Sequence, residues 1–239
     1  MKETRPRLQE GLSDYVGSLK SNSINRVLVI GDLHEPFSLD KYLDFCIEQG
    51  KRFNTNKTIF IGDVIDNHFS SYHETDADGL GGGDELDLAI SRLSRWRDAF
   101  PVADVIIGNH DRLVMRKAQT SAVPKKWIKE YKDVLEVPEW NFTDRIVLDG
   151  VQYIHGEAGT ARMKGKSDMM PTVQGHLHTQ CYTEWVVGEK FKIFCSQVGC
   201  GIDHESYAMA YAKRGKKPAI GCMVVLDNGQ TPINLLMNL

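Results

Sequence analysis

Five short segments of the sequence place oxygen or imidazole side chains directly beside glycine. In order, they are 31–34 (Gly-Asp-Leu-His), 62–67 (Gly-Asp-Val-Ile-Asp-Asn), 108–111 (Gly-Asn-His-Asp), 155–156 (His-Gly) and 175–178 (Gly-His-Leu-His). In the first and last segments two donors stand two positions apart, and such residues face one side of an extended chain. Carboxylate, carboxamide and imidazole donors together suit Mn²⁺, Fe or Zn²⁺, whereas thiolates favour structural zinc and oxygens alone favour Mg²⁺ or Ca²⁺. The segments therefore indicate metal binding.

Seven side chains are the candidate metal ligands: Asp32, His34, Asp63, Asn109, His155, His176 and His178. A turn or helix-cap role could explain any one of them, since Asp and Asn are common at such places, but it does not explain all seven in order. They are too many for one four- to six-coordinate ion. We therefore expect two divalent ions that share a carboxylate, with Mn²⁺ favoured and Fe, Zn²⁺, Ni²⁺ or Co²⁺ as alternatives.

The elements that position these donors begin with strands, because four of the five segments follow apolar runs rich in β-branched residues. Strands are expected over 27–31, 58–62, 104–108 and 151–155. In open α/β sheets, binding sites collect where strands end and loops begin. Helices are expected over 40–47, stopped by Gly50, and over 84–100, which gives a parallel sheet with right-handed crossovers. The segments 112–119 and 124–134 also have helical patterns.

The second part of the chain changes to short strands. Besides 151–155 they are expected over 145–148, 172–175, 181–187, 190–196, 220–227 and 231–237. Turns at 149–150, 187–189 and 227–229 predict hairpins, so this part should be mostly antiparallel. The sequence thus predicts an α/β fold with two packed mixed β-sheets flanked by helices. We expect one domain over 1–239, with an N-terminal helical arm over about 1–25 and a polar loop insertion over about 67–83.

Composition places few limits on function. The 239 residues are 41% hydrophobic and 26% charged, as in ordinary soluble proteins. A net charge of −3 gives no overall attraction for nucleic acid. Basic residues do form two local clusters, which are most simply solvated surfaces: Arg112, Arg116, Lys117, Lys125, Lys126 and Lys129, and then Lys213, Arg214, Lys216 and Lys217. Five irregularly spaced cysteines suit free thiols in a reducing compartment. With no apolar run resembling a signal peptide or membrane span, we expect a cytoplasmic protein.

The five segments together resemble the pattern of the calcineurin-like metallophosphoesterases: D-x-H, G-D-x-x-D, G-N-H-(D/E), a lone His and G-H-x-H. The resemblance covers residues 31–178 and implies a four-layer α/β/β/α sandwich. It also implies two ligand groups with Asp63 as the bridge: Asp32, His34 and His178 for one ion, and Asn109, His155 and His176 for the other.

The same resemblance implies the catalytic roles. His110 would lie beside the scissile phosphate, and Asp66 would orient it. A carboxylate behind an imidazole raises its basicity and fixes its tautomer, so His110 is the expected general acid. The nucleophile would be a water or hydroxide shared by the two ions, because divalent ions lower its pKa. Hydrolysis would then proceed by in-line attack on phosphorus.

The substrate is less strongly defined. In the protein Ser/Thr phosphatase branch the second motif continues G-D-x-V-D-R-G, and its Arg binds phosphate, whereas this chain has Asn67 and His68 there. We therefore expect a phosphodiester of a nucleic acid or nucleotide, as in small members often encoded by bacteriophages, whose protein would act in the host cytoplasm. The alternatives are a phosphomonoesterase acting on a small molecule or phosphoprotein, and a non-catalytic metal-binding scaffold.

Several other residues carry weaker expectations. Arg112, whose planar fork suits phosphate, is a candidate substrate contact or an ordinary surface arginine. His68 and His73, in the polar loop, are candidates too, with solvated loop histidines as the simpler interpretation. Asp111 is expected to cap the helix that follows it, with orientation of the third loop as the alternative. All four tryptophans are expected to take part in core or domain packing: Trp96, Trp127, Trp140 and Trp185.

Overall fold

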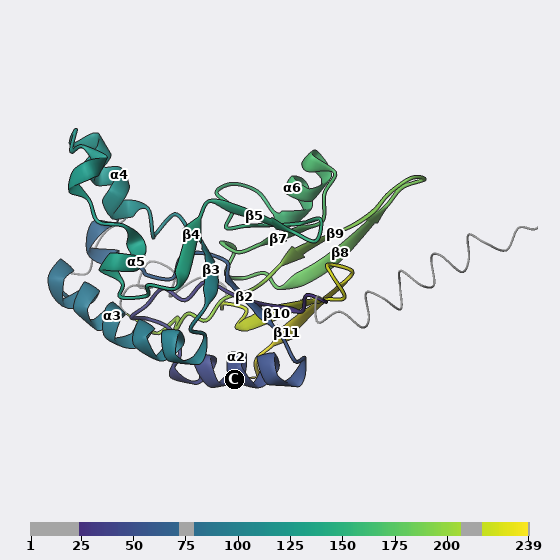
Figure 1. Cartoon of the computed structure of the whole chain (residues 1–239), viewed down its shortest axis with the longest axis horizontal. Coiled ribbons are helices and arrows are strands. Elements are labelled where there is room, and N and C mark those ends of the chain that lie inside the picture. The colour runs from purple at the N-terminus through teal and green to yellow at the C-terminus, as the bar shows by residue number, and fades with distance from the viewer. Residues whose placement is uncertain (1–23, 72–78, 207–216, 239) are drawn as a thin grey trace, which may run out of the picture.

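Two β-sheets pack face to face, and helices cover their outer faces, in a computed structural model that describes residues 24–71, 79–206 and 217–238 (Figure 1). The first sheet has six strands in the order β11-β10-β1-β2-β3-β4. Its four parallel strands are β1 (Val27–Ile30), β2 (Lys57–Phe60), β3 (Ala103–Ile106) and β4 (Trp140–Thr143). An antiparallel hairpin joins the sheet beside β1 and consists of β10 (Gly221–Leu226) and β11 (Thr231–Leu236).

The second sheet has five strands in the order β5-β6-β7-β9-β8. Their bounds are Arg145–Leu148 (β5), Val151–Ile154 (β6), Thr172–Gln174 (β7), Tyr182–Val187 (β8) and Lys192–Gln197 (β9). The edge strands β5 and β8 are antiparallel to their neighbours, as the predicted hairpins require. The three central strands, however, are parallel, so the expectation of a mostly antiparallel second half is wrong there.

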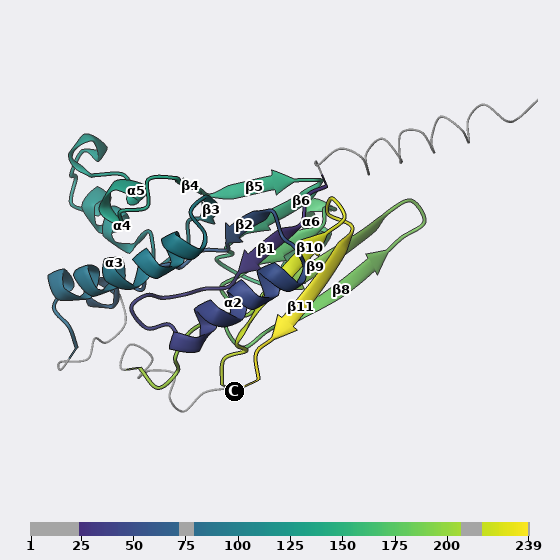
Figure 2. The same ribbon diagram turned by 60° about the horizontal axis from the view of Figure 1, so that its bottom comes forward.

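Helices complete four layers. On the outer side of the six-stranded sheet lie α2 (Asp40–Arg52) and α3 (Gly82–Ala99), while α6 (Ala161–Asp168) contacts β7 and β9 of the other sheet (Figure 2). One short helical piece, η1 (His68–Ser70), follows β2. Three more follow β3: α4 (Leu113–Thr120), η2 (Lys125–Trp127) and α5 (Tyr131–Val134). The predicted α/β/β/α arrangement of two mixed sheets between helices is confirmed.

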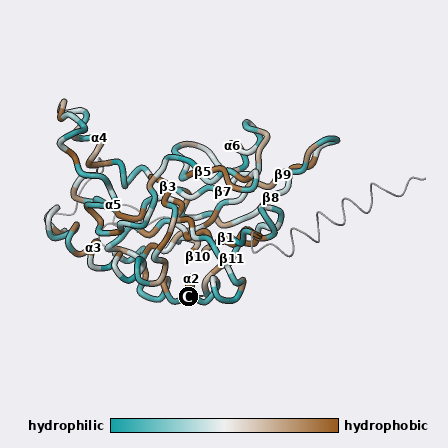
Figure 3. The backbone as a smooth tube through the Cα atoms, in the orientation of Figure 1, coloured by the Kyte–Doolittle hydropathy of each residue, from teal (hydrophilic) through white to brown (hydrophobic). Residues whose placement is uncertain are grey.

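Strand β1 shows why the interior has two apolar layers. Leu28 and Ile30 belong to the layer between the six-stranded sheet and the helices, whereas Val27 and Val29 belong to the layer between the two sheets. All four side chains are buried because side chains alternate between the faces of a strand, and both faces of this sheet are covered. Hydrophobic residues accordingly follow the strands through the middle of the molecule (Figure 3).

Some sequence expectations differ from the structure. Helix α2 continues through Gly50 to Arg52. The glycine has a packing role, because it lies beside Leu28 of β1 and a larger residue would crowd Thr55. The expected helix over 124–134 consists only of the short pieces η2 and α5. Strand β4 and helix α6 were not predicted; α6 lacks an apolar face, and its first turn is capped by the Thr160 side chain, which accepts a hydrogen bond from the Met163 N–H.

The tryptophans divide into two pairs. Trp96 and Trp140 are buried, and Phe60 packs between them, with its ring 4.5 Å from that of Trp140. Trp127 and Trp185 have 82% and 43% of their surface exposed, so the core assignment is wrong for both.

The five cysteines are free, as expected. Residues 1–23 of the predicted N-terminal arm lie outside the described residues, as do 72–78 of the polar loop. Among the described residues, no helix combines the length and apolar character needed to cross a membrane.

Candidate metal centre

The seven candidate ligands follow directly after strands of both sheets. Asp32 and His34 follow β1, Asp63 follows β2, and Asn109 follows β3. The remaining three come from the second sheet, with His155 after β6 and with His176 and His178 after β7. Since all these strands run in parallel within their sheets, their carboxyl ends bring the loops together at one edge of the molecule.

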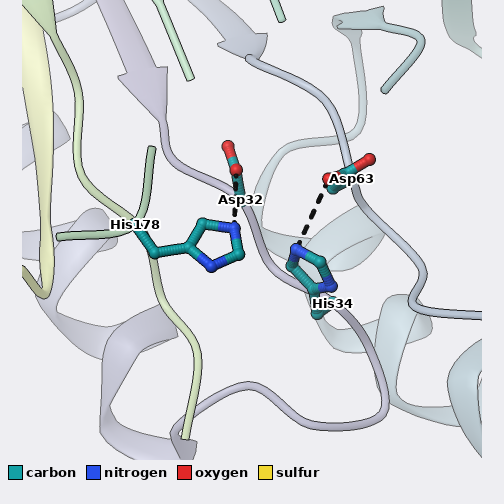
Figure 4. Close-up of side chains that lie close together, drawn as sticks. All are labelled: Asp32, His34, Asp63 and His178. Carbon is teal, nitrogen blue, oxygen red and sulfur yellow. Dashed lines mark ion pairs between the residues drawn. The ribbon is translucent and has the colours of Figure 1, made fainter. Parts of the chain in front are cut away.

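Four of the ligands form one tight group. Donor atoms of Asp32, His34, Asp63 and His178 all lie within 4.8 Å of one another. Figure 4 shows the two imidazoles directed at the two carboxylates. His34 Nε2 is 3.5 Å from Asp63 Oδ2, and His178 Nε2 is 3.2 Å from Asp32 Oδ2. The group is buried except for part of the His178 ring.

A second group shares Asp63 with the first. Donor atoms of Asp63, His155 and His176 lie within 4.8 Å of one another, and His155 Nε2 is 3.1 Å from Asp63 Oδ2. Asn109 belongs beside them, because its Oδ1 is 2.9 Å from His155 Nε2. The structure thus brings together all seven side chains that the sequence singled out. One atom, Asp63 Oδ2, faces both groups.

Unpartnered polar atoms support a cation at this position. Asp32 Oδ1, His34 Nε2, Asp63 Oδ2 and His178 Nε2 are buried and have no hydrogen-bond partner among the described residues. Buried polar atoms nearly always have a partner, so four such atoms in one place need an explanation. Two are carboxylate oxygens and two are imidazole nitrogens, which are the donor types that Mn²⁺, Fe and Zn²⁺ accept. The residues present therefore fit divalent metal ions.

Neighbouring acceptors also fix the tautomers that metal binding requires. His34 Nδ1 lies 2.5 Å from Asp66 Oδ1, and His155 Nδ1 lies 3.0 Å from the Ile61 carbonyl oxygen. Each Nδ1 therefore donates a hydrogen bond away from the centre, which leaves Nε2 as the ring atom that a metal would bind. Burial lowers the pKa of His155, but the Asp63 and Asp32 carboxylates outweigh it and raise the pKa to about 9. The same negative potential attracts a metal cation.

The Asp66 carboxylate lies near His34 as well as near His110. Its Oδ1 is nearer to His34 than to His110, whose Nδ1 lies 3.3 Å away; His110 Nδ1 instead donates to the Asp66 backbone carbonyl at 2.7 Å. Although burial raises the pKa of Asp66, hydrogen bonds from His110 and His34 lower it well below its usual range. Burial lowers the pKa of His110, yet the Asp66 hydrogen bond and the Asp63 charge raise it to about 10. His110 thus carries a proton at neutral pH.

Asp111 does not cap α4, so that expectation is wrong. Its carboxylate is buried and accepts backbone hydrogen bonds from Ile65 N at 3.2 Å and from Gly108 N at 2.8 Å. The side chain points inward because these two N–H groups need an acceptor inside the protein. Asp111 therefore ties the loop after β2 to the loop after β3, which carry Asp63 and Asn109.

The candidate substrate contacts are less accessible than the sequence suggests. His68 is buried, with its ring nitrogen Nδ1 3.8 Å from Asp66 Oδ2. Arg112 forms an ion pair with Glu157, lies 3.3 Å from Asp144 Oδ1, and donates to the Ile107 carbonyl at 3.0 Å. His73 lies outside the described residues. Substrate contact by these three side chains stays a prediction.

Glu85 is a residue that the sequence did not single out. From α3, its buried carboxylate accepts hydrogen bonds from His68 N at 2.7 Å and from Phe69 N at 3.3 Å. Burial is the main reason that its pKa is raised to about 7. Glu85 thereby holds the chain that leaves Asp66. Nothing in its sequence neighbourhood indicates this, because its partners lie on the far side of the polar loop.

Glycine beside the ligands permits close packing of the loops. A Cβ atom at Gly108 would lie 2.7 Å from Asp63 Cγ and would collide with Asp63 Oδ1 and N. Gly62, with φ +113°, adopts a conformation that other residues rarely adopt, and a Cβ there would collide with the His155 ring. The glycines of these motifs therefore bring Asp63 and His155 close to the neighbouring loops.

Comparison with known proteins gives a family match. A family model described as calcineurin-like phosphoesterase matches residues 25–187. No protein with a curated function matches the sequence. Vacuolar protein sorting 29 from Cryptosporidium parvum aligns with a TM-score of 0.48 at 13% identity, over 90% of this chain and 92% of that chain. The nuclease MPE from Pseudomonas putida aligns with a TM-score of 0.44 at 13% identity, over 87% of this chain and 86% of that chain. YfcE, a phosphoesterase from E. coli, aligns with a TM-score of 0.41 at 13% identity, over 89% of this chain and 100% of that chain.

The Gly108→Ala variant should bind metal poorly, because the new methyl group must displace Asp63 from the position where both ligand groups meet. We expect at least a tenfold weaker affinity for Mn²⁺ by calorimetry. Gly83→Ala is the matched control, since a Cβ there meets nothing within 4 Å. Equal metal affinity in the two variants would show that the close approach of Gly108 to Asp63 is unimportant.

Proposed function

Because this chain belongs to the calcineurin-like phosphoesterase family, we propose that it hydrolyses phosphate esters with two divalent metal ions, which are held by the seven convergent side chains. The observation that carries the proposal is the position of Asp63 Oδ2, which faces His34 in one donor group and His155 in the other. One ion would be held by Asp32, His34, Asp63 and His178. The other would be held by Asp63, Asn109, His155 and His176.

The protein's own residues perform the remaining steps. When bound, divalent ions supply a water molecule of lowered pKa as nucleophile and neutralise the phosphate oxygens. Asp66 and the backbone hold His110 by Nδ1, which leaves Nε2 as the atom that can reach a substrate. As the water oxygen bonds to phosphorus and the ester bond breaks, His110 donates its proton to the leaving oxygen. The hydrogen bond to Asp66 raises the pKa of His110 and so favours the protonated ring that this step needs.

A phosphodiester of a nucleic acid or nucleotide is the proposed substrate. Two features support it: the chain lacks the arginine that follows the second motif in protein phosphatases, and basic residues cluster just after His110. Phosphomonoester hydrolysis, of a small molecule or a phosphoprotein, is the alternative. A scaffold that had lost its chemistry should lack ligands, yet none of the seven is missing. Use of Mn²⁺, a cytoplasmic location and a bacteriophage origin stay predictions.

Metal content and hydrolysis of two chromogenic esters test the function together. We expect about two equivalents of divalent metal by elemental analysis, and faster hydrolysis of bis(p-nitrophenyl) phosphate than of p-nitrophenyl phosphate. Chelation should abolish turnover, and Mn²⁺ should restore it. Hydrolysis of the monoester alone would favour the phosphomonoesterase alternative, whereas bound metal with neither ester cut would favour the scaffold.

The Asp63→Asn variant should lose both metals and all measurable turnover, because it removes the charge from the one carboxylate that faces both groups. Elemental analysis and diester hydrolysis measure the two effects. Asp98→Asn is the control, since it removes the same charge from an exposed surface carboxylate. Turnover within tenfold of the parent in Asp63→Asn would exclude Asp63 as the bridge.

Loss of the imidazole in the His110→Asn variant should leave metal content intact and lower kcat by about 10²–10⁴, the usual range for a general acid. The loss should shrink for substrates with acidic leaving groups, because these depart without a proton. Rates for a series of substituted aryl esters measure this dependence. If every ester slows by the same factor, His110 stabilises the phosphate and does not donate a proton.

A further inference from the structure

The segment after His110 is strongly basic. Residues 112–132 contain seven lysines and arginines and one acidic residue, in a chain whose net charge is −3. They form α4, η2 and the start of α5, which lie together at one end of the molecule (Figures 1 and 2). We call residues 112–132 the basic end.

An exposed tryptophan lies within this segment. Trp127 has 82% of its surface exposed, although large apolar side chains gain free energy by burial. Lys125, Lys126 and Lys129 surround it in the sequence and are exposed as well. In the described parts of the chain, none of these three lysines has an ion-pair partner, whereas Lys132 pairs with Glu130 at 3.4 Å. Solvation explains surface lysines, but it does not explain the exposed indole between them.

A cavity of about 770 Å³ opens beside the tryptophan. Its lining includes Lys125, Lys126, Lys129 and Lys132 together with the aromatic residues Tyr131 and Phe142. Both chain neighbours of Trp127, Lys126 and Ile128, belong to this lining. Ile107 also belongs to it, and this residue lies two positions before the candidate ligand Asn109. The cavity therefore borders the start of the loop that carries Asn109 and His110.

We propose that the basic end binds single-stranded nucleic acid, with the Trp127 indole stacked on a base and with Lys125, Lys126 and Lys129 beside the phosphates. Aromatic side chains set among lysines are how proteins hold unpaired strands, because every base has a face for stacking and every linkage has a charge. A projecting ring needs a base that is not already stacked in a duplex, which favours a single strand.

What the basic end implies about the substrate rests on the proposed function. A strand bound at the basic end would lie beside the loop after β3, because Ile107 lines the cavity at the start of that loop. The substrate would then be a polynucleotide and not a free nucleotide. An anionic membrane surface is the competing occupant, but the lysines line a concave cavity and do not form a flat amphipathic face.

Binding of a fluorescent 20-nucleotide oligothymidylate, followed by anisotropy with chelator present and at several salt concentrations, tests the proposal. We expect Trp127→Ala to weaken binding at least fivefold, the lower range for one stacked base. The triple variant K125E/K126E/K129E should weaken binding more than tenfold. It should also make the slope of log K against log salt concentration shallower by about 2, because each phosphate contact on a single strand contributes about 0.7 to that slope.

Two control variants match these changes at other surfaces. Trp185→Ala removes a half-exposed tryptophan from β8. K41E/K51E/K57E makes the same change of charge at exposed positions of α2 and β2. Both controls should bind the oligonucleotide within twofold of the parent. Equal losses in controls and test variants, or retained binding in both test variants, would overturn the proposal, as would parent protein that binds phosphatidylserine vesicles but no oligonucleotide.

Hydrolysis of bis(p-nitrophenyl) phosphate separates this proposal from the proposed function. The small ester does not extend to the basic end, so all four variants should cut it at the parent rate. Parent protein that cuts this ester and binds no oligonucleotide would overturn the basic end alone. Oligonucleotide binding that depends on Trp127 and the three lysines, in a protein that cuts no ester, would support the binding surface and overturn the proposed function.

Discussion

The Asp63 carboxylate is the constraint on which the rest of the structure depends. It is buried where loops from both sheets meet, with Oδ2 facing His34 and His155 and with Oδ1 accepting a hydrogen bond from His110 N at 2.8 Å. Its backbone carbonyl accepts hydrogen bonds from Leu33 N and His34 N as well. A buried charge is costly unless it is paired, so this one carboxylate requires positive charge around it. The histidines supply part of that charge, and a divalent cation would supply the rest.

The backbone near this carboxylate adopts uncommon left-handed conformations. Asp63, His34 and His176 all have positive φ angles, of 48°, 52° and 69°. Residues other than glycine are uncommon in that region, and they persist where the surrounding structure holds them. Here the loops are held by Asp111, which ties two of them together, and by Glu85, which holds the chain after Asp66. The left-handed residues direct donors into both of the groups that share Asp63.

The centre also lies between the two sheets, so neither sheet can form it alone. Asp32, Asp63 and Asn109 follow strands of the six-stranded sheet, while His155 and His176 follow strands of the other. A metal bound here would therefore link the two sheets and stabilise their packing. The basic end leaves the same edge through the β3–α4 connection. The proposed chemistry and the proposed nucleic-acid binding thus depend on one group of loops.

The sequence by itself determined the set of candidate ligands and most strands, because both depend on local patterns. Apolar runs such as 27–30 are followed directly by Gly-Asp or Gly-Asn. An apolar run before a turn indicates a strand, whichever residues pack against it in the fold. The layered fold followed from the order of these patterns and from the family they resemble. Hairpins at 149–150 and 227–229 were predictable for the same reason, since their turn residues are adjacent in the chain.

Only the tertiary structure decided which atoms meet. Asp66 lies closer to His34 than to His110, and Asp111 bonds Ile65 and Gly108 instead of capping α4. The exposure of Trp127 and the role of Glu85 likewise depend on what surrounds each residue in space. The physical reason is that a hydrogen bond or a buried surface joins residues far apart in the chain, and local sequence does not specify those distances.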